Sequence, residues 1–328
     1  MTGQPIGIIG AGAWGTALAS VMAQNHEEVL LWALEPEVIE AVNAGQGNPL
    51  YLPNLALPPQ IRATGDMAEM VGCSALLLVT PAQHLRGTLE RLPATNAPLL
   101  LCSKGIEAGT QLLVSEIVAE LRPDNPLAVL SGPTFAHEVA AGKPTAITLA
   151  CESEALGKLL MRLVATPALR PYWSDDVVGA EIGGAVKNVL AIGCGVVDGA
   201  GLGLNARAAL IARGFAEMQR YGLARGAQAE TLSGLSGLGD LVLTCSSENS
   251  RNFSLGRGLG QGRAAAELMA DRRTVAEGAF TAPVLLESAQ SLGVEMPIVA
   301  AVCALLDGSA SVGQVVEALL SRPLKAER

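Results

Sequence analysis

Short runs of branched apolar residues recur through the first half of the chain, separated by turn residues or amphipathic segments. Runs that are wholly apolar, and not alternating, are typical of strands in a parallel sheet covered on both faces. We therefore predict β-α-β units that build a mostly parallel sheet. The predicted strands are residues 5–10, 28–33, 75–80, 98–103, 126–131, 145–150 and 169–174.

The pattern changes at Ser174, Asp175 and Asp176, which are all favourable helix N-caps. Beyond them, segments rich in Ala and Leu repeat at helical spacing and no convincing strand run returns. The predicted helical segments are 177–195, 205–225, 281–292 and 297–307. The glycine-rich run at 256–263 is interpreted as a loose helix end.

The length of 328 residues suggests two domains. We expect an α/β domain over residues 1–178 and an all-helical domain over residues 179–328. This is the fold class that the pattern predicts.

Composition narrows the classes of protein that remain. A formal charge of -9 offers no overall basic field, so we expect no nucleic-acid partner. The six cysteines are scattered without a CxxC pair, which favours reduced thiols, a cytoplasmic location and no metal site. The start of the chain lacks a basic leader, and the apolar runs of the first half are far shorter than the roughly 20 residues of a membrane span. We expect no export signal and no membrane span.

A glycine motif, Gly10-Ala11-Gly12-Ala13-Trp14-Gly15, joins the first predicted strand to a helix-prone segment. Glycines permit a tight turn, let the backbone approach a pyrophosphate and leave helix N–H groups facing the anion. Alone, the motif often marks only a tight turn. Its place between an N-terminal strand and a helix supports a Rossmann-type dinucleotide site.

Glu35 lies just past the second predicted strand, 20 residues beyond Gly15. An acidic side chain there would accept hydrogen bonds from the adenosine ribose hydroxyls. The alternative is a solvated carboxylate in a turn.

Lys187 is a cation within the apolar stretch GGAVKNVLAIGCG, residues 183–195. Gly183 and Gly184 lie one helical turn before it, which leaves space for another group, and Leu190 and Ala191 lie one turn after it. Desolvation on such a face would lower the lysine pKa towards neutrality, so that the amine can accept a proton from an alcohol or return one to a carbonyl. The alternative is a lysine that extends to the surface from a packed helix.

Other polar residues accompany Lys187. Asp240, between glycine and leucine, is either an ion-pair partner for Lys187 or a helix cap. Arg251 and Asn252 stand where a helical pattern begins, which suits an oxyanion or phosphate clamp, although a surface arginine in a loop is the alternative.

Two predicted strands of the first half are also followed by candidate site residues. Lys104 follows one strand, and Gly132 and Thr134 follow the next. Both positions are at the carboxyl edge of the sheet, where ligands of such sheets bind.

Taken together, these stretches resemble the bacterial NAD(P)-dependent sn-glycerol-3-phosphate dehydrogenases over nearly the whole chain. The matching blocks, in order, are GAGAWGTALA, SKGIE, SGPTFA, GGAVKNVLAIG, GLGDLVLTC, NSRN and GVEMPI. The resemblance implies reversible hydride transfer between NAD(P)H and dihydroxyacetone phosphate, giving sn-glycerol 3-phosphate for phospholipid synthesis. It also implies NAD or NADP as cofactor, a small phosphorylated substrate and a homodimer.

The resemblance assigns roles to individual residues. It makes Lys187 the proton acceptor, with Asp240 and Lys104 beside it in the catalytic group. The implied substrate contacts are Lys104, Gly132, Thr134, Lys187, Asp240, Ser250, Arg251 and Asn252. The cofactor-lining positions, with those of the glycine loop and the second strand, are Gly10, Gly12, Ala13, Trp14, Gly15, Leu34, Glu35, Lys104, Ala136, Arg251, Val275 and Glu277. Leu34 departs from the polar or basic residue of many members, so Glu35 without a neighbouring cation predicts that NADH is used at least as well as NADPH.

Two rival functions remain open on the residues alone. A 3-hydroxyacid dehydrogenase also pairs a Rossmann domain with a helix-borne lysine, and Arg251 would then bind a carboxylate. A redox-sensing NAD-binding regulator would keep the glycine loop but would not need Lys187 and Asp240 together.

Overall fold

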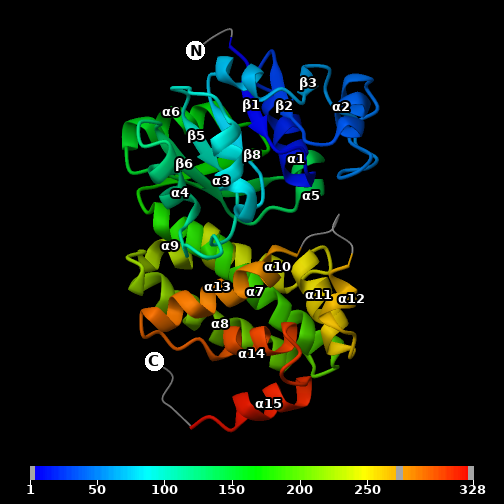
Figure 1. The fold of residues 1–328 in the computed structure, drawn as a ribbon, viewed down its shortest axis with the longest axis vertical. Helices are drawn as coiled ribbons and strands as arrows, with labels where there is room; N and C mark the ends of the chain where they lie inside the picture. The colour runs from blue at the N-terminus through cyan, green and yellow to red at the C-terminus, as the bar shows by residue number, and fades with distance from the viewer. Residues whose placement is uncertain (1–3, 271–275, 324–328) are drawn as a thin grey trace.

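The computed structural model describes residues 4–270 and 276–323, which form an α/β half followed by a helical half (Figure 1). One eight-stranded sheet has the order β3-β2-β1-β4-β5-β6-β7-β8. Neighbouring strands are parallel except for β6 and β7, which are antiparallel. The strands are β1 Ile6–Ile9, β2 Val29–Trp32, β3 Ile61–Thr64, β4 Leu76–Leu78, β5 Leu99–Leu101, β6 Leu127–Ser131, β7 Thr145–Ala150 and β8 Leu169–Ser174.

The fold class and all seven predicted strands are confirmed, and β3 is an eighth strand that the sequence analysis missed. β3 pairs with β2 at one edge of the sheet, and its residues read Ile-Arg-Ala-Thr. Only one branched aliphatic residue is present, and Arg62 is exposed. An edge strand of this composition lacks the apolar run by which the central strands are recognised.

Both faces of the sheet are covered, because each carries its own hydrophobic cluster. This double burial explains why the central strands are wholly apolar. The helices of this half, including one 3-10 helix η1, are α1 Ala13–Met22, α2 Pro36–Asn43, η1 Met67–Gly72, α3 Ala82–Arg91, α4 Val114–Leu121, α5 Ala136–Ala140 and α6 Glu154–Val164.

The second half is helical throughout the part that the structure describes, and it has its own core. The four predicted helical segments correspond to α7, α8, α13 and α14. The elements are α7 Val177–Gly199, α8 Leu204–Ala224, α9 Ala229–Ser233, the π-helix η2 Leu235–Gly239, α10 Asp240–Cys245, α11 Arg251–Gly260, α12 Ala265–Leu268, α13 Glu277–Ser291, α14 Pro297–Leu306 and α15 Val312–Leu320.

Helix α7 belongs to both halves. Asp176 caps it, because its carboxylate accepts a hydrogen bond of 2.7 Å from the Gly179 amide, as the N-cap prediction expected. Val177 and Ala180 pack in a core on one face of the sheet, whereas Ile182 and the residues after it pack in the helical core. Within the described chain, α7 alone is long and apolar enough to cross a membrane, but 94% of its most apolar window is buried inside the protein. It is a core helix.

The glycine-rich run at 256–263 contains the end of α11, as expected, but the expectation that this end is loose is wrong. Its first part lies within α11, which packs closely against α7. A Cβ atom at Gly256 would overlap the carbonyl oxygen of Ile192, and one at Gly195 would overlap the carbonyl oxygen of Phe253. The glycines therefore let the backbones of two buried helices touch, and they fix α11 and its first residue, Arg251, against α7.

Candidate active site

Three glycines of the first loop have three separate tasks. Gly10 has a φ of +115°, and a Cβ there would lie 3.0 Å from the Val79 carbonyl carbon. A Cβ at Gly15 would overlap the carbonyl oxygen of Gly10, so this glycine permits close packing of α1 on the turn. At Gly12 a Cβ would meet nothing within 4 Å. The backbone is thus exposed to open space at the N-cap of α1, as a pyrophosphate requires.

Asn48 holds this loop from outside, and the sequence analysis missed it. Its buried amide donates hydrogen bonds of 2.8 Å to the Ala11 carbonyl and to the Thr16 hydroxyl. Its Oδ1 accepts a hydrogen bond of 3.2 Å from the Tyr51 amide. A polar residue in a loop gives no signal in the sequence that it reaches across 37 residues to the glycine motif.

Glu35 is held by a hydrogen bond and is not a freely solvated turn residue. The Tyr51 hydroxyl donates a hydrogen bond of 2.7 Å to Glu35 Oε1, which leaves the second carboxylate oxygen for another donor. Leu34 beside it is 65% exposed.

Three further cofactor positions lie on two helices that pack against each other. Ala13 and Trp14 open α1, and Ala136 opens α5, which packs against α1. Val275 lies outside the described residues.

Lys187 and Asp240 form an ion pair, as one of the two interpretations of Asp240 predicted. Lys187 Nζ lies 2.8 Å from Asp240 Oδ1 and donates a second hydrogen bond of 3.0 Å to Thr244 Oγ1. Both charged side chains are buried. Lys187 therefore does not extend to the surface, and α10 presents Asp240 and Thr244 to it from one face at i and i+4.

Lys104 completes the cluster from the other half of the molecule. Its ammonium lies 2.6 Å from Asp240 Oδ2 and donates a hydrogen bond of 3.2 Å to the Gly132 carbonyl. Thr134 Oγ1 donates to the same carbonyl at 3.2 Å. One carboxylate thus bridges two lysines that are distant in sequence, and residues following β5 and β6 meet α7 and α10.

Burial and charge together set the protonation of this cluster. Desolvation lowers the pKa of Lys187 to about 8, Asp240 opposes this shift, and the charge of Lys104 adds to it. Desolvation by itself would raise the pKa of Asp240, but Lys104 and Lys187 lower it below its usual range. Lys187 is therefore the group in the cluster that can gain and lose a proton near neutral pH, as the sequence analysis predicted.

The space before Lys187 is only partly open, which corrects one expectation. A Cβ at Gly183 would overlap the carbonyl oxygen of Ser236, so this glycine admits the backbone of η2 and not a ligand. A Cβ at Gly184 would instead lie 3.1 Å from Ser131 Oγ and 3.3 Å from Lys104 Cγ. Only Gly184 faces the cluster.

Arg251 opens α11, whose N-cap is Ser250 through a hydrogen bond of 3.2 Å from the Phe253 amide to Ser250 Oγ. Within residues 4–270 and 276–323, the exposed Arg251 guanidinium has no hydrogen-bond partner. Asn252, by contrast, donates to Asn188 Oδ1 at 3.0 Å and accepts from the Gly278 amide at 2.9 Å. Its amide links α7, α11 and α13 and so has limited capacity left for a ligand.

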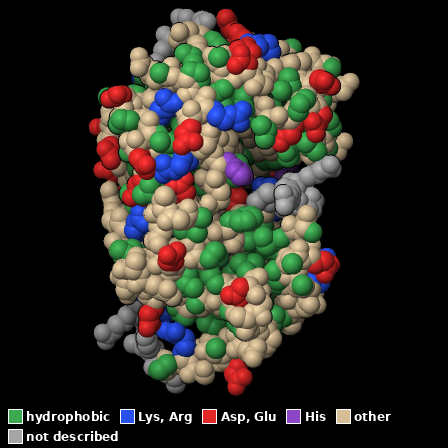
Figure 2. Space-filling model, viewed as in Figure 1, with side chains coloured by type: hydrophobic (Ala, Val, Ile, Leu, Met, Phe, Trp, Pro, Cys, Tyr) green, Lys and Arg blue, Asp and Glu red, His purple; other side chains and the backbone are tan. Residues whose placement is uncertain are grey.

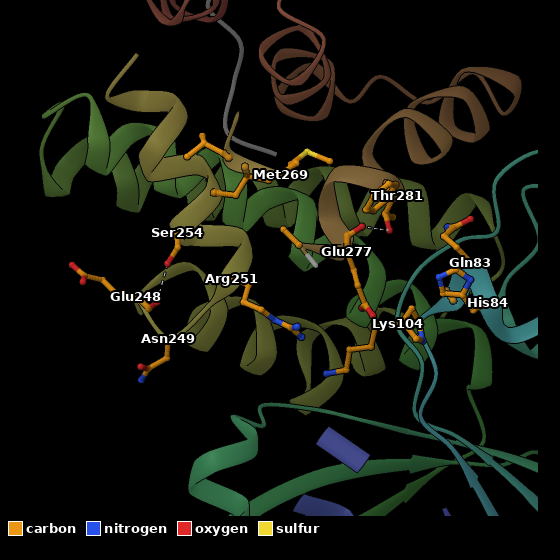
Figure 3. Close-up of a pocket in the computed structure, with 16 residues that line it drawn as sticks. Gln83, His84, Lys104, Glu248, Asn249, Arg251, Ser254, Met269, Glu277 and Thr281 are labelled. Atoms are coloured by element: carbon orange, nitrogen blue, oxygen red, sulfur yellow. Dashed lines mark hydrogen bonds between the residues drawn. The ribbon is translucent and has the colours of Figure 1, made fainter. Parts of the chain in front are cut away.

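A cavity of about 800 Å³ lies where the two halves meet, and the surface is visibly hollowed there (Figure 2). Lys104 and Arg251 line it together with Glu277, and their side chains lie in the same part of the cavity (Figure 3). Desolvation raises the pKa of Glu277, although Arg251 and both lysines oppose that shift. The cavity thus combines a guanidinium that has no hydrogen-bond partner among the described residues with a lysine that contacts the buried cluster.

Comparison with known proteins shows which family this chain resembles. The family model described as NAD-dependent glycerol-3-phosphate dehydrogenase N-terminus matches residues 5–157, and the corresponding C-terminus model matches residues 176–317. The glycerol-3-phosphate dehydrogenase (NAD(P)+) of Erythrobacter litoralis is 62% identical over 322 residues, covering 98% of this chain and 97% of the relative. The crystal structure of a glycerol-3-phosphate dehydrogenase from Coxiella burnetii is 39% identical with a TM-score of 0.93, covering 97% of this chain and 99% of that one.

Proposed function

The chain belongs to the NAD-dependent glycerol-3-phosphate dehydrogenase family and is an NAD(P)+-dependent oxidoreductase with that activity, and we propose that Lys187 exchanges the proton of the reaction. Membership of this family rules out the two rival functions. The observation that carries the proposal is a buried lysine that pairs with Asp240 and whose pKa is lowered to about 8 by desolvation, with a contribution from the charge of Lys104.

In our proposal the substrate is dihydroxyacetone phosphate in one direction and sn-glycerol 3-phosphate in the other. A nicotinamide coenzyme held by the glycine loop would supply the hydride to C2 in one direction and take it in the other. In the reductive direction, the Lys187 ammonium donates a proton to the carbonyl oxygen as the C–O π bond opens, and it becomes a neutral amine. In the oxidative direction the neutral amine takes the hydroxyl proton. Asp240 keeps the lysine in place, and Lys104 lowers its affinity for that proton.

The other roles in the proposal follow the geometry. Arg251 binds the substrate phosphate, because it opens a helix, is unpaired among the described residues and lines the cavity. Gly132, Thr134, Ser250 and Asn252 complete the substrate site. The glycine loop holds the pyrophosphate, Glu35 accepts from the ribose, and Trp14, Ala136 and Glu277 line the cofactor.

We further propose two domains, 1–178 for the dinucleotide and 179–328 for substrate and catalysis, in a cytoplasmic homodimer that feeds phospholipid synthesis. The free thiols of the six cysteines support a reducing compartment. The dimer and the metabolic role rest on resemblance to the family.

The test of Lys187 is the substitution Lys187→Met. We expect kcat to fall by at least about 10²-fold, while NADH affinity and Tm hold because Lys104 still pairs with Asp240. In the wild type, reduction should slow as pH rises through about 8, where the ammonium is lost, and this limb should vanish in the variant. Lys158→Met, on an exposed helix surface, is the control. Near-wild-type turnover of Lys187→Met would remove this residue from the mechanism.

A further inference from the structure

The loop that carries Lys104 has its internal backbone hydrogen bonds beyond that residue, as from the Glu107 amide to the Leu112 carbonyl at 2.9 Å. It runs from the end of β5 to the start of α4. Within it Gly105, Gly109 and Gln111 have φ values of +146°, +86° and +61°. A left-handed conformation at Gln111, a non-glycine residue, persists only where surrounding contacts impose it. The position of Lys104 therefore depends on contacts from outside the loop.

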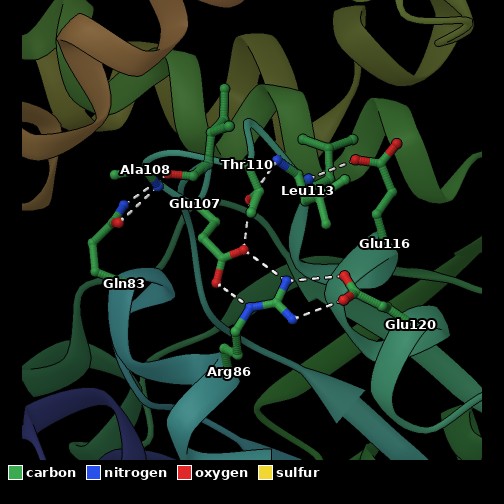
Figure 4. Close-up of polar contacts among 10 residues, drawn as sticks. Gln83, Arg86, Glu107, Ala108, Thr110, Leu113, Glu116 and Glu120 are labelled. Atoms are coloured by element: carbon green, nitrogen blue, oxygen red, sulfur yellow. Dashed lines mark hydrogen bonds and ion pairs between the residues drawn. The ribbon is translucent and has the colours of Figure 1, made fainter.

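Gln83 on α3 forms hydrogen bonds to the loop backbone on both sides of Glu107. Its Nε2 donates a hydrogen bond of 2.7 Å to the Ile106 carbonyl, and its Oε1 accepts one of 3.0 Å from the Ala108 amide. The amide therefore fixes the backbone on both sides of Glu107 (Figure 4). Lys104 lies two residues before the first of these contacts.

Arg86, one turn further along α3, fixes the side chain of Glu107. Its Nε and Nη2 donate hydrogen bonds of 2.9 Å to the two carboxylate oxygens of Glu107, and Nη1 and Nη2 reach Glu120 on α4 at 3.1 and 3.0 Å (Figure 4). Thr110 Oγ1 donates a further bond of 2.6 Å to Glu107. The Arg86 hydrogen bond is the main reason that the pKa of Glu107 is lowered although the residue is buried.

The opposite side of the loop is packed into the helical half. Ile106 and Leu113 are fully buried members of the helical core, although they belong to the sheet half by sequence. Polar contacts to α3 therefore hold one side of the loop, and apolar contacts to the helical core hold the other side. Just before these contacts along the chain, Lys104 Nζ reaches Asp240 at 2.6 Å.

We propose that Gln83 and Arg86 are positioning residues for catalysis, which act by holding the loop so that Lys104 stays on Asp240. This proposal rests on the proposed function of the cluster formed by Lys187, Asp240 and Lys104. Neither residue needs to touch the reacting atoms to do so.

The position of Lys104 has a measurable consequence for Lys187. The ionisable groups that act on Lys187 are Asp240 and Cys245 of α10, Lys104 and, from α13, Glu277. Among these groups Lys104 lowers the pKa of Lys187, and it also shares the carboxylate of Asp240. Moving Lys104 away removes a neighbouring positive charge and frees Asp240, so both changes raise the pKa of Lys187.

The experiment compares Arg86→Ala with Arg122→Ala. Arg122 ends α4 and donates hydrogen bonds to the Leu89 and Leu92 carbonyls, so it joins the same two helices at a distance from the loop. We expect Arg86→Ala and Gln83→Leu to lower kcat by roughly 10- to 100-fold. The alkaline limb of the reductive rate should move up by about one pH unit. Arg122→Ala should lower Tm without moving that limb.

A double-mutant cycle isolates the route through Lys104. Arg86→Ala should cost little further kcat once Lys104→Met is present, because the group that it positions is gone. Arg86→Lys should recover only part of the activity, since it lacks the planar fork.

The proposal is overturned if the Arg86 and Arg122 variants lose Tm alike with unchanged pH profiles, or if the losses of Arg86→Ala and Lys104→Met simply add. Failure of the underlying function would look different, because Lys187→Met would then remain active.

Discussion

We assign binding of the substrate phosphate to the guanidinium of Arg251. A bidentate charge-assisted contact is typically worth about 1.5–3 kcal/mol, so Arg251→Ala should lower kcat/KM for dihydroxyacetone phosphate by roughly 10- to 200-fold. Arg251→Lys should recover only part, because a compact charge replaces a planar fork.

Unphosphorylated dihydroxyacetone is the control substrate for Arg251. Its poor activity should hardly change, since it lacks the group that Arg251 binds. Equal proportional losses on both ketones, together with a lower Tm, would mean that Arg251 supports the fold.

We propose that Glu35 and Leu34 decide the choice between NADH and NADPH. One oxygen of Glu35 accepts from Tyr51 and the other is free for a ribose hydroxyl, while Leu34 provides no charge for a 2′-phosphate. We expect kcat/KM with NADH to equal or exceed that with NADPH, and Leu34→Arg to shift the ratio towards NADPH by about tenfold. A strong wild-type preference for NADPH in side-by-side assays would show that a basic residue elsewhere reaches the phosphate.

The sequence analysis found the charged residues that stand in apolar stretches, and it missed polar residues that stand where polar residues are common. Lys187 and Asp240 could be found because a charge among apolar residues needs a partner. Asn48, Gln83 and Arg86 could not, because polar residues on a loop or a helix surface are expected everywhere. What they contact follows from tertiary structure, which no spacing in the sequence records.

At the scale of elements, the close approach of α7 and α11 is the feature most open to test. Gly256→Ala should destabilise the protein by about 1–3 kcal/mol, because the new methyl overlaps the Ile192 carbonyl and the helices must separate. Gly87→Ala is the matched control. Gly87 lies within α3 where a Cβ meets nothing within 4 Å, so alanine should stabilise by about 0.5–1 kcal/mol.

Thermal unfolding of the two glycine variants measures both effects. If both variants gained stability, the contact between α7 and α11 would be looser than described here. Activity gives a second reading, since separation of the helices also moves Arg251.

The helices and strands, like the site residues, include some that the sequence analysis predicted and some that it missed. Long helices and central strands were predicted because their apolar patterns are sustained, whereas β3 lacks an apolar run and α9 and α12 are only five and four residues long. The π-helix η2 has no sequence signal of its own. It brings Gly237 beside α7, where a Cβ on Gly183 would lie 2.9 Å from the Gly237 Cα atom.

Across the whole molecule, a buried acid joins the two halves. Glu181 of α7 accepts hydrogen bonds of 2.7 Å from the Ser115 amide and hydroxyl of α4, yet desolvation raises its pKa to about 7. The folded state therefore holds this proton more tightly than the unfolded state, whose carboxyl has the usual value of 4.5. Stability should fall as pH rises from about 4.5 to about 7 and should stay lower above that range.

Glu181→Gln removes this dependence and keeps an acceptor for the Ser115 amide. We expect its Tm relative to wild type to rise between pH 5 and pH 8, reaching a gain of roughly 2 °C or more. Glu230→Gln, on the exposed surface of α9, should show no such trend. A Tm difference for Glu181→Gln that stays constant with pH would contradict the raised pKa.

The membership of α7 in two cores limits how this architecture can be recombined. One unbroken helix begins beneath the sheet and ends among the helices, and Ile106 and Leu113 cross in the opposite direction to fill the helical core. A chimaera joined where the α/β half changes to the helical half would therefore disrupt packing that both halves share. Exchanging a whole half between two enzymes would require matching core residues in both halves. The loops that surround the cavity, by contrast, can change in sequence one at a time.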